Sequence, residues 1–124
     1  MSFNSYSAIT NLSSQQLIEA KKNGTVIIDI RTPEEWQATG TIAEASTIMF
    51  FNQQRQPLVE EFMSQFKKVV LSKDQKFVLV CRSGTRTKAV ANYLYNELGY
   101  TNVSHLAKGM NQWILDSQPV VSNK

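Results

Sequence analysis

Two short runs of apolar residues constrain the fold of this 124-residue chain more than any other feature. The first covers residues 26–30 and is interrupted only by Asp29, and the second covers residues 77–80. A strand that is apolar at nearly every position is buried on both faces, as in a parallel sheet covered by helices. The two runs therefore predict a parallel sheet.

Helix signals alternate with these strands. Ser13 is placed to cap a helix that runs to about residue 23, with Gln16 completing a capping box. Thr32 is a second N-cap, and Pro33 follows it at the first helical position. Further helices are expected over residues 59–70, from about 87 to 98, and over 110–115, with strands at 46–49 and 102–105 and frayed ends at 1–6 and 119–124. Alternating strands and helices indicate an α/β domain with helices on both faces of the sheet.

Composition narrows the function classes. The net charge is +3 and basic residues are not clustered, so nucleic-acid binding is not indicated. No apolar run reaches the length of a membrane span, and no signal peptide is evident at the N-terminus. With one cysteine, neither an internal disulfide nor a cysteine-based metal site is expected, and no cofactor is implied. We expect one cytoplasmic domain over residues 1–124, with its core at about 10–115.

The single cysteine, Cys81, lies where a reactive thiol is expected. It directly follows the second apolar run and is followed by a polar loop, Arg82-Ser83-Gly84-Thr85-Arg86, and then by a helical pattern. Such a loop curls around the sulfur, so its N–H groups and the helix N-terminus favour an anion there. Free cysteines are often inert core residues. The two arginines and the polar loop favour a stabilised thiolate instead.

Other candidate residues gather at the same edge of the sheet. Asp29 and Arg31 lie at the carboxyl end of the first apolar strand, where α/β folds place their active sites. We expect both to support the site structurally, and we expect Asp29 or Glu35 to hold Arg86. Packing or structural roles are predicted for Trp36, His105 and Trp113, whereas Phe50 and Phe51 fit either the core or a partner surface.

Four segments in chain order give the sequence a resemblance to the single-domain rhodaneses, a family of sulfurtransferases. The segments are Asp-Ile-Arg at 29–31 with Glu-Glu-Trp at 34–36, Gly-Thr-Ile-Ala-Glu-Ala at 40–45, Cys-Arg-Ser-Gly-Thr-Arg at 81–86, and Leu-Ala-Lys-Gly at 106–109 with Trp113. The resemblance covers about residues 10–115. It implies a five-stranded parallel sheet and a persulfide on Cys81, with residues 82–86 cradling the substrate.

The implied reaction moves sulfur from thiosulfate or another small anionic donor to a thiol, cyanide or protein acceptor. Two alternatives use the same fold: a carrier that receives sulfur from a protein, and a regulatory module without activity. A cysteine-dependent phosphatase is a weaker alternative. Phosphatases with a comparable loop have five residues between Cys and Arg, and here there are four.

Three positions depart from the family pattern. Thr41 stands where the family usually has His, Glu44 replaces a Gly, and Lys108 replaces the first Gly of the closing pair. All three lie outside the cysteine loop. They are expected to affect turn geometry and the rim of the site.

Overall fold

The computed structural model describes residues 9–123, and its centre is one five-stranded sheet. The strand order is β1-β5-β4-β2-β3, and all neighbouring strands run parallel. The strands are β1 (Ile9–Leu12), β2 (Val26–Asp29), β3 (Ser46–Thr47), β4 (Phe77–Val80) and β5 (Val103–Leu106). The predicted parallel α/β sheet is confirmed, and β4 and β2 are its central strands.

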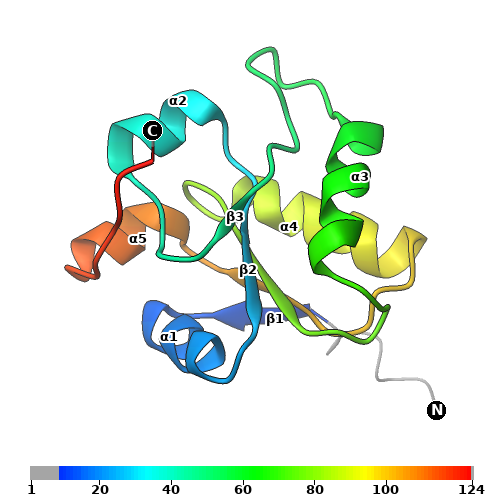
Figure 1. Ribbon diagram of the computed structural model, residues 1–124, viewed down its shortest axis with the longest axis horizontal. Coiled ribbons are helices and arrows are strands. Elements are labelled where there is room, and N and C mark those ends of the chain that lie inside the picture. Colours follow the sequence, from blue (N-terminus) through cyan, green and yellow to red (C-terminus); the bar gives the residue numbers. More distant parts are fainter. Residues whose placement is uncertain (1–8, 124) are drawn as a thin grey trace.

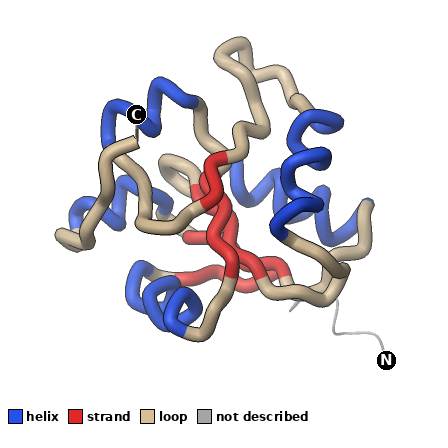
Figure 2. The backbone as a smooth tube through the Cα atoms, viewed as in Figure 1, coloured by secondary structure: helices blue, strands red, loops and turns tan. Residues whose placement is uncertain are grey.

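Helices cover both faces of this sheet (Figures 1 and 2). Side chains of α1 (Ser14–Lys22) and α5 (Gly109–Leu115) pack in one apolar cluster, with Val78 and Val80 of β4. Those of α3 (Val59–Val69) and α4 (Thr85–Asn92) pack in the other, with Phe77 and Leu79 of the same strand. Alternate residues of one buried strand thus serve two cores, which is why β4 is apolar throughout. The helix α2 (Pro33–Thr39) follows β2.

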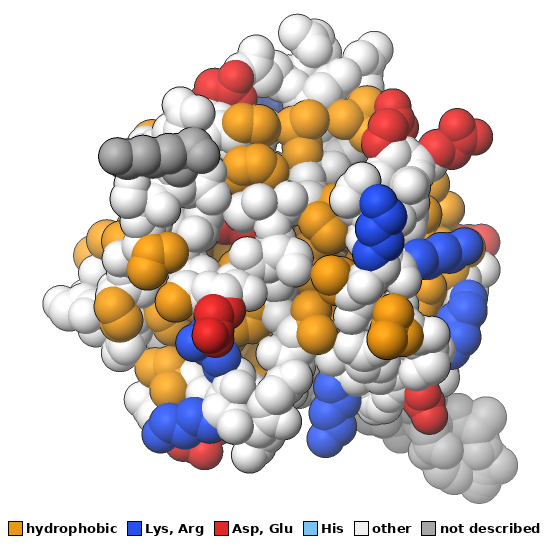
Figure 3. Space-filling model, viewed as in Figure 1, with side chains coloured by type: hydrophobic (Ala, Val, Ile, Leu, Met, Phe, Trp, Pro, Cys, Tyr) orange, Lys and Arg blue, Asp and Glu red, His pale blue; other side chains and the backbone are white. Residues whose placement is uncertain are grey.

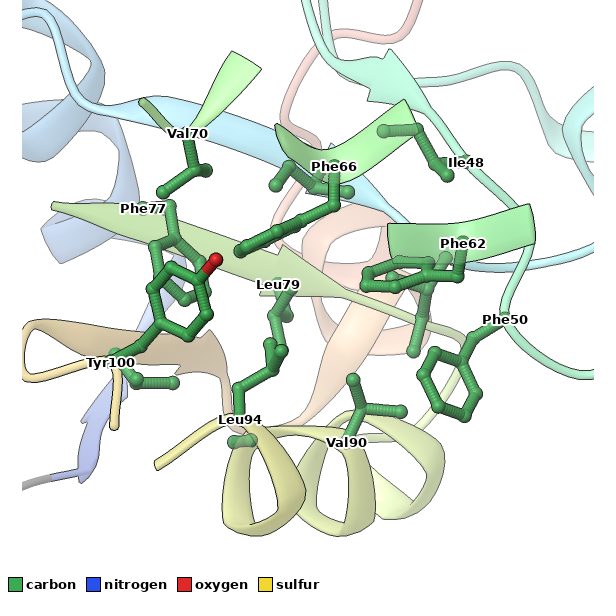
Figure 4. Packing of buried hydrophobic residues seen from close by; sticks show 14 of the residues in the cluster. Ile48, Phe50, Phe62, Phe66, Val70, Phe77, Leu79, Val90, Leu94 and Tyr100 are labelled. Carbon is green, nitrogen blue, oxygen red and sulfur yellow. The ribbon is translucent and has the colours of Figure 1, made fainter. Parts of the chain in front are cut away.

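Aromatic side chains dominate the core on the α3 side (Figure 4). Phe66 of α3 meets Phe77 of β4 edge to face, with ring centroids 5.0 Å apart, and meets Tyr100 in the same way at 5.1 Å. Phe62 packs on Phe50 at 4.8 Å. Edge-to-face contacts suit the quadrupoles of aromatic rings and add to the stabilisation from burial. Phe50 is therefore a core residue, which the sequence left undecided.

The predicted caps are confirmed at two helices. Ser13 and Thr32 each form a full capping box, with Gln16 and Glu35 respectively, and Pro33 lies in the first turn of α2. These side chains satisfy backbone N–H groups that have no partner within the helix. Local sequence thus sets where α1 and α2 begin.

Several elements differ from the sequence-based prediction. The edge strand β1 was not predicted from its residues, because four residues of mixed polarity give no periodic signal. The helix after Cys81 ends in a π-helical turn, η2 (Tyr93–Glu97). The expectation of a frayed end over 119–124 is wrong at Val121, which pairs with Thr41 in both directions. Residues 1–6 lie outside the described part of the chain.

The length of the helices and the distribution of charged side chains characterise the described part of the chain. Between residues 9 and 123, no helix is long and apolar enough to cross a bilayer. On the face drawn in Figure 3, acidic and basic side chains are interspersed, and apolar side chains lie between them.

Candidate active site

The sulfur of Cys81 lies at the base of a tight loop between β4 and α4. The side chain is only 1% exposed. The N–H group of Gly84 donates a hydrogen bond to Sγ over 3.2 Å, and α4 begins at the next residue, Thr85. Gly84 has φ = 97°, a left-handed conformation that turns the backbone towards the sulfur. A backbone donor and a helix N-terminus therefore converge on this atom, and both favour negative charge.

The loop rests against the segment that joins β5 to α5. The N–H groups of Met110 and Asn111, in the first turn of α5, donate to the carbonyls of Cys81 and Arg82 over 2.8 and 3.0 Å. A Cβ on Gly109 would lie 2.3 Å from the Arg82 carbonyl oxygen. The second glycine position of the closing motif is thus required for this backbone contact. Lys108, at the first position, has φ = −111°, which any residue can adopt.

Arg86 is held by Glu35, one of the two acids expected to pair with it. Its Nη1 and Nη2 donate to the two carboxylate oxygens over 2.8 and 2.7 Å. Burial alone would raise the pKa of Glu35, but the hydrogen bonds from Arg86 and Thr32 hold it at about 2. The hydrogen bonds to Glu35 also raise the pKa of Arg86. This bidentate ion pair fixes the start of α4 against the start of α2.

Asp29 instead binds Arg31, and both are almost fully buried. Arg31 Nη2 lies 2.8 Å from Asp29 Oδ2, and Trp36 Nε1 donates to Asp29 Oδ1 over 3.1 Å. Arg31 also donates to Thr39 and to the Gly40 carbonyl. A buried charge is stable only when it is paired and hydrogen-bonded, and here both charges are. This cluster joins the end of β2 to the middle and the C-terminal end of α2.

The remaining loop residues face solvent. Arg82, Ser83 and Thr85 are exposed, and the hydroxyl groups of Ser83 and Thr85 lie 3.4 Å apart. Because Glu35 engages Arg86, the exposed Arg82 is the loop arginine better placed to meet an anion from solution. Among residues 9–123, no three His, Cys, Asp or Glu side chains are grouped to hold a metal ion.

Two polar residues beneath the sulfur were not identified as site residues from the sequence. The hydroxyl of Thr87 lies 3.5 Å from Cys81 Sγ, and the ring of His105 lies 2.7 Å from that hydroxyl. His105 was expected to be structural because it is a lone histidine on a short strand. For Thr87, the available signal was its position in the sequence: it directly follows Arg86 and is the third residue of α4.

The three departures from the family pattern lie in different places, and Glu44 contacts α1 near the start of β2 and not the cysteine loop, so its expected place at the rim of the site is not supported. Glu44, in place of Gly, has φ = 69°, and its carboxylate lies 3.2 Å from the Lys21 ammonium. Thr41 is 4% exposed and exchanges backbone hydrogen bonds with Val121. Lys108 is exposed at the N-terminus of α5.

Comparison with known proteins places the chain in a family. Residues 13–116 match the family model of the rhodanese-like domain. A sulfurtransferase from Allochromatium vinosum is 30% identical over 116 residues, which cover 92% of this chain and 96% of that protein.

Solved structures agree in fold. A rhodanese-related protein from Thermoplasma volcanium is 25% identical with a TM-score of 0.70, over 92% of this chain and 99% of that one. A Rhodopseudomonas palustris protein of unknown function, described as a possible tyrosine phosphatase, is 25% identical with a TM-score of 0.64, over 94% of this chain and 88% of that one. The chain belongs to the rhodanese-like family, as its four sequence segments predicted.

Proposed function

We propose that this protein is a sulfurtransferase that carries sulfane sulfur on Cys81 as a persulfide. The supporting observation is the cradle around Sγ, where the Gly84 N–H and the N-terminus of α4 meet an almost fully buried sulfur. These fixed dipoles stabilise an anionic sulfur without reorganising during the reaction. The exposed Arg82 supplies the charge that attracts an anionic donor such as thiosulfate.

The reaction proceeds in two half-reactions. The Cys81 thiolate attacks the outer sulfur of thiosulfate, the sulfur–sulfur bond of the donor breaks, and its electron pair leaves with sulfite. Cys81 then carries the transferred sulfur as a persulfide anion near the loop N–H groups. An acceptor such as cyanide or a thiol attacks that outer sulfur, and the electron pair of the broken bond returns to Cys81 as the thiolate.

Intact mass spectrometry tests this proposal directly. After reduction and removal of the reductant, thiosulfate is expected to add the mass of one sulfur atom, and cyanide or a thiol is expected to remove it. Because Cys81 is the only cysteine in the chain, one adduct is expected. Cys81→Ser is the control. An adduct that persists in this variant, or no adduct on the reduced wild type, contradicts the mechanism.

The same preparation separates the alternatives. Faster loading from a protein persulfide than from thiosulfate indicates a sulfur carrier that acts on a protein partner. The similarity to a possible tyrosine phosphatase makes an aryl phosphate the second substrate to test. The loop has four residues between Cys81 and Arg86, so we expect no hydrolysis of para-nitrophenyl phosphate. Hydrolysis that disappears in Cys81→Ser would reverse this ranking.

A further inference from the structure

A chain of hydrogen bonds leads from the sulfur of Cys81 away from the loop and through the sheet. Sγ lies 3.5 Å from Thr87 Oγ1, which lies 2.7 Å from His105 Nδ1. On the other side of the ring, His105 Nε2 lies 2.9 Å from Asn11 Oδ1. The four residues come from the end of β4, from α4, from β5 and from β1, so the fold itself brings them together.

The donors and acceptors in this series of hydrogen bonds have a defined order. With Asn11 Oδ1 as an acceptor, His105 Nε2 carries the hydrogen and Nδ1 has a free lone pair. The Thr87 hydroxyl then donates to Nδ1, and its own lone pair accepts from the Cys81 thiol. The Gly84 carbonyl competes for the hydroxyl, but it lies 3.2 Å away and also accepts from the Lys88 N–H. The shorter contact with His105 therefore sets the direction of the hydroxyl.

We propose that His105 accepts the proton of the Cys81 thiol through Thr87, and so acts as a positioning residue for the reactive thiolate. The thiol proton moves to Thr87 Oγ1 while the hydroxyl proton of Thr87 moves to His105 Nδ1. The products are a thiolate that accepts a hydrogen bond from Thr87 and an imidazolium that donates to Thr87 and Asn11. All three hydrogen bonds are retained. The Cys81–Thr87 and Thr87–His105 hydrogen bonds exchange donor and acceptor, and the His105–Asn11 hydrogen bond keeps its direction. The inference rests on the proposed function, because the thiolate is the attacking form.

The surroundings of His105 suit a temporary proton acceptor. The ring is 4% exposed. Burial, with a smaller contribution from the Lys88 ammonium on α4, lowers the pKa of His105, so the ring is neutral at neutral pH and its Nδ1 lone pair is available. The same burial opposes protonation of the ring, so proton transfer depends on the negative charge formed on the sulfur in the same step. Asn11 on β1 and Thr87 on α4 contribute no charge, and β4 contributes the apolar Leu79 beside it in register. The thiolate itself is the charge that stabilises the imidazolium, so the two charges form together.

An open groove gives the proton a path to solvent on this side of the loop. Its volume is about 650 Å³, and its lining includes Asn11, Gly84, Lys88 and His105 but not Cys81. Ser83 and Thr85 of the cysteine loop also line this groove, so a proton on His105 can exchange with water at the edge of the loop.

Alkylation of Cys81 by iodoacetamide at different pH values tests the relay without any sulfur donor. The chain has one cysteine and one histidine, so the single adduct and the single histidine signal are unambiguous. In His105→Asn and Thr87→Val, we expect the rate at neutral pH to fall about tenfold and the rate profile to move about one unit to higher pH. Thr87→Ser keeps the hydroxyl and is expected to restore the profile lost in Thr87→Val.

The matched control is a variant in which the pH profile of Cys81 alkylation is expected to shift in the opposite direction. Asn11→Asp places a carboxylate on the exposed end of the chain, where it stabilises the imidazolium, so the profile is expected to move to lower pH. A purely structural role for His105 does not produce shifts in both directions. By NMR, the histidine is expected to titrate at lower pH in Cys81→Ser than in wild type, because the thiolate is absent.

Profiles of His105→Asn and Thr87→Val that coincide with wild type overturn the relay. If His105→Asn does not fold, the comparison of Thr87→Val with Thr87→Ser decides. Normal sulfur loading with unshifted profiles rejects the relay alone. Shifted profiles without any sulfur loading reject the proposed function and leave the relay in place.

Discussion

Two arginine–carboxylate pairs hold the residues around Cys81, and they differ in exposure. The Asp29–Arg31 pair is 1% exposed on each side, whereas the side chains of Arg86 and Glu35 are 28% and 26% exposed. The buried pair links residues two apart in sequence, and the partly exposed pair links residues 51 apart. The second pair therefore fixes the cysteine loop to α2.

Glu35→Gln is expected to destabilise the fold by about 1–2 kcal/mol at pH 7, because a charge-assisted pair becomes a neutral contact. Glutamine can still close the capping box with Thr32 through its amide oxygen, so the substitution removes the charge and the acceptor of Arg86 Nη2 but keeps the cap. The pKa of Glu35 is lowered from 4.5 to about 2, so its contribution is complete above pH 4.5 and is lost as the pH falls towards 2. Urea unfolding at several pH values measures this difference between variant and wild type.

Glu34→Gln is the matched control, because Glu34 is exposed in the same helical turn. Its effect is expected to be small. The role given to Glu35 is wrong if both variants behave alike, or if the effect of Glu35→Gln does not diminish in acid.

At the scale of elements, the cysteine loop is shaped by backbone contact with the segment before α5. A Cβ on Gly84 would lie 2.0 Å from the Ala107 carbonyl oxygen, and the residue has φ = 97°. Gly99, which ends η2, has φ = 79°, but a Cβ there meets nothing within 4 Å. Both glycines therefore need a positive φ, but only at Gly84 would a side chain also clash with a neighbouring backbone.

Gly99→Ala is expected to lower the free energy of unfolding by about 1 kcal/mol, which is the strain of a left-handed alanine. Gly84→Ala adds a backbone clash and is expected to lower it by about 3 kcal/mol or more. Thermal or urea unfolding measures both values, and sulfur loading of Gly84→Ala below its unfolding transition reports on the cradle. Equal losses in the two variants would mean that the loop moves freely away from Ala107.

The elements that could be predicted from sequence are those whose signals are local. The caps at Ser13 and Thr32 and the apolar strands β2 and β4 depend on neighbouring residues, so the chain itself specifies them. The strand β1 and its Asn11 gain their role only by pairing with β5, far along the chain. The link from His105 to Asn11 was therefore beyond sequence reasoning, while Cys81 and its loop were not.

At the scale of the whole molecule, the C-terminal segment after α5 is held by hydrogen bonds to α5 and to the turn after α2. Trp113 Nε1 donates to the Pro119 carbonyl over 2.9 Å. Thr41 and Val121 exchange two backbone hydrogen bonds, of 2.9 and 2.8 Å. A Cβ on Gly40 would lie 2.6 Å from the Val121 carbonyl oxygen, so the segment lies directly against the turn after α2. This contact could not be predicted from the sequence, because a short tail without periodicity resembles a frayed end.

Truncation after Gln118 is expected to destabilise the protein by about 2–3 kcal/mol, because three hydrogen bonds worth about 1 kcal/mol each are lost. Truncation after Val121 is the control, since it keeps all three bonds and is expected to change the stability little. Urea unfolding of the two shortened chains beside the full chain measures the difference. If the two truncations are equally stable, the segment contributes nothing, and the turn at Gly40 and Thr41 is held by the sheet and α2 alone.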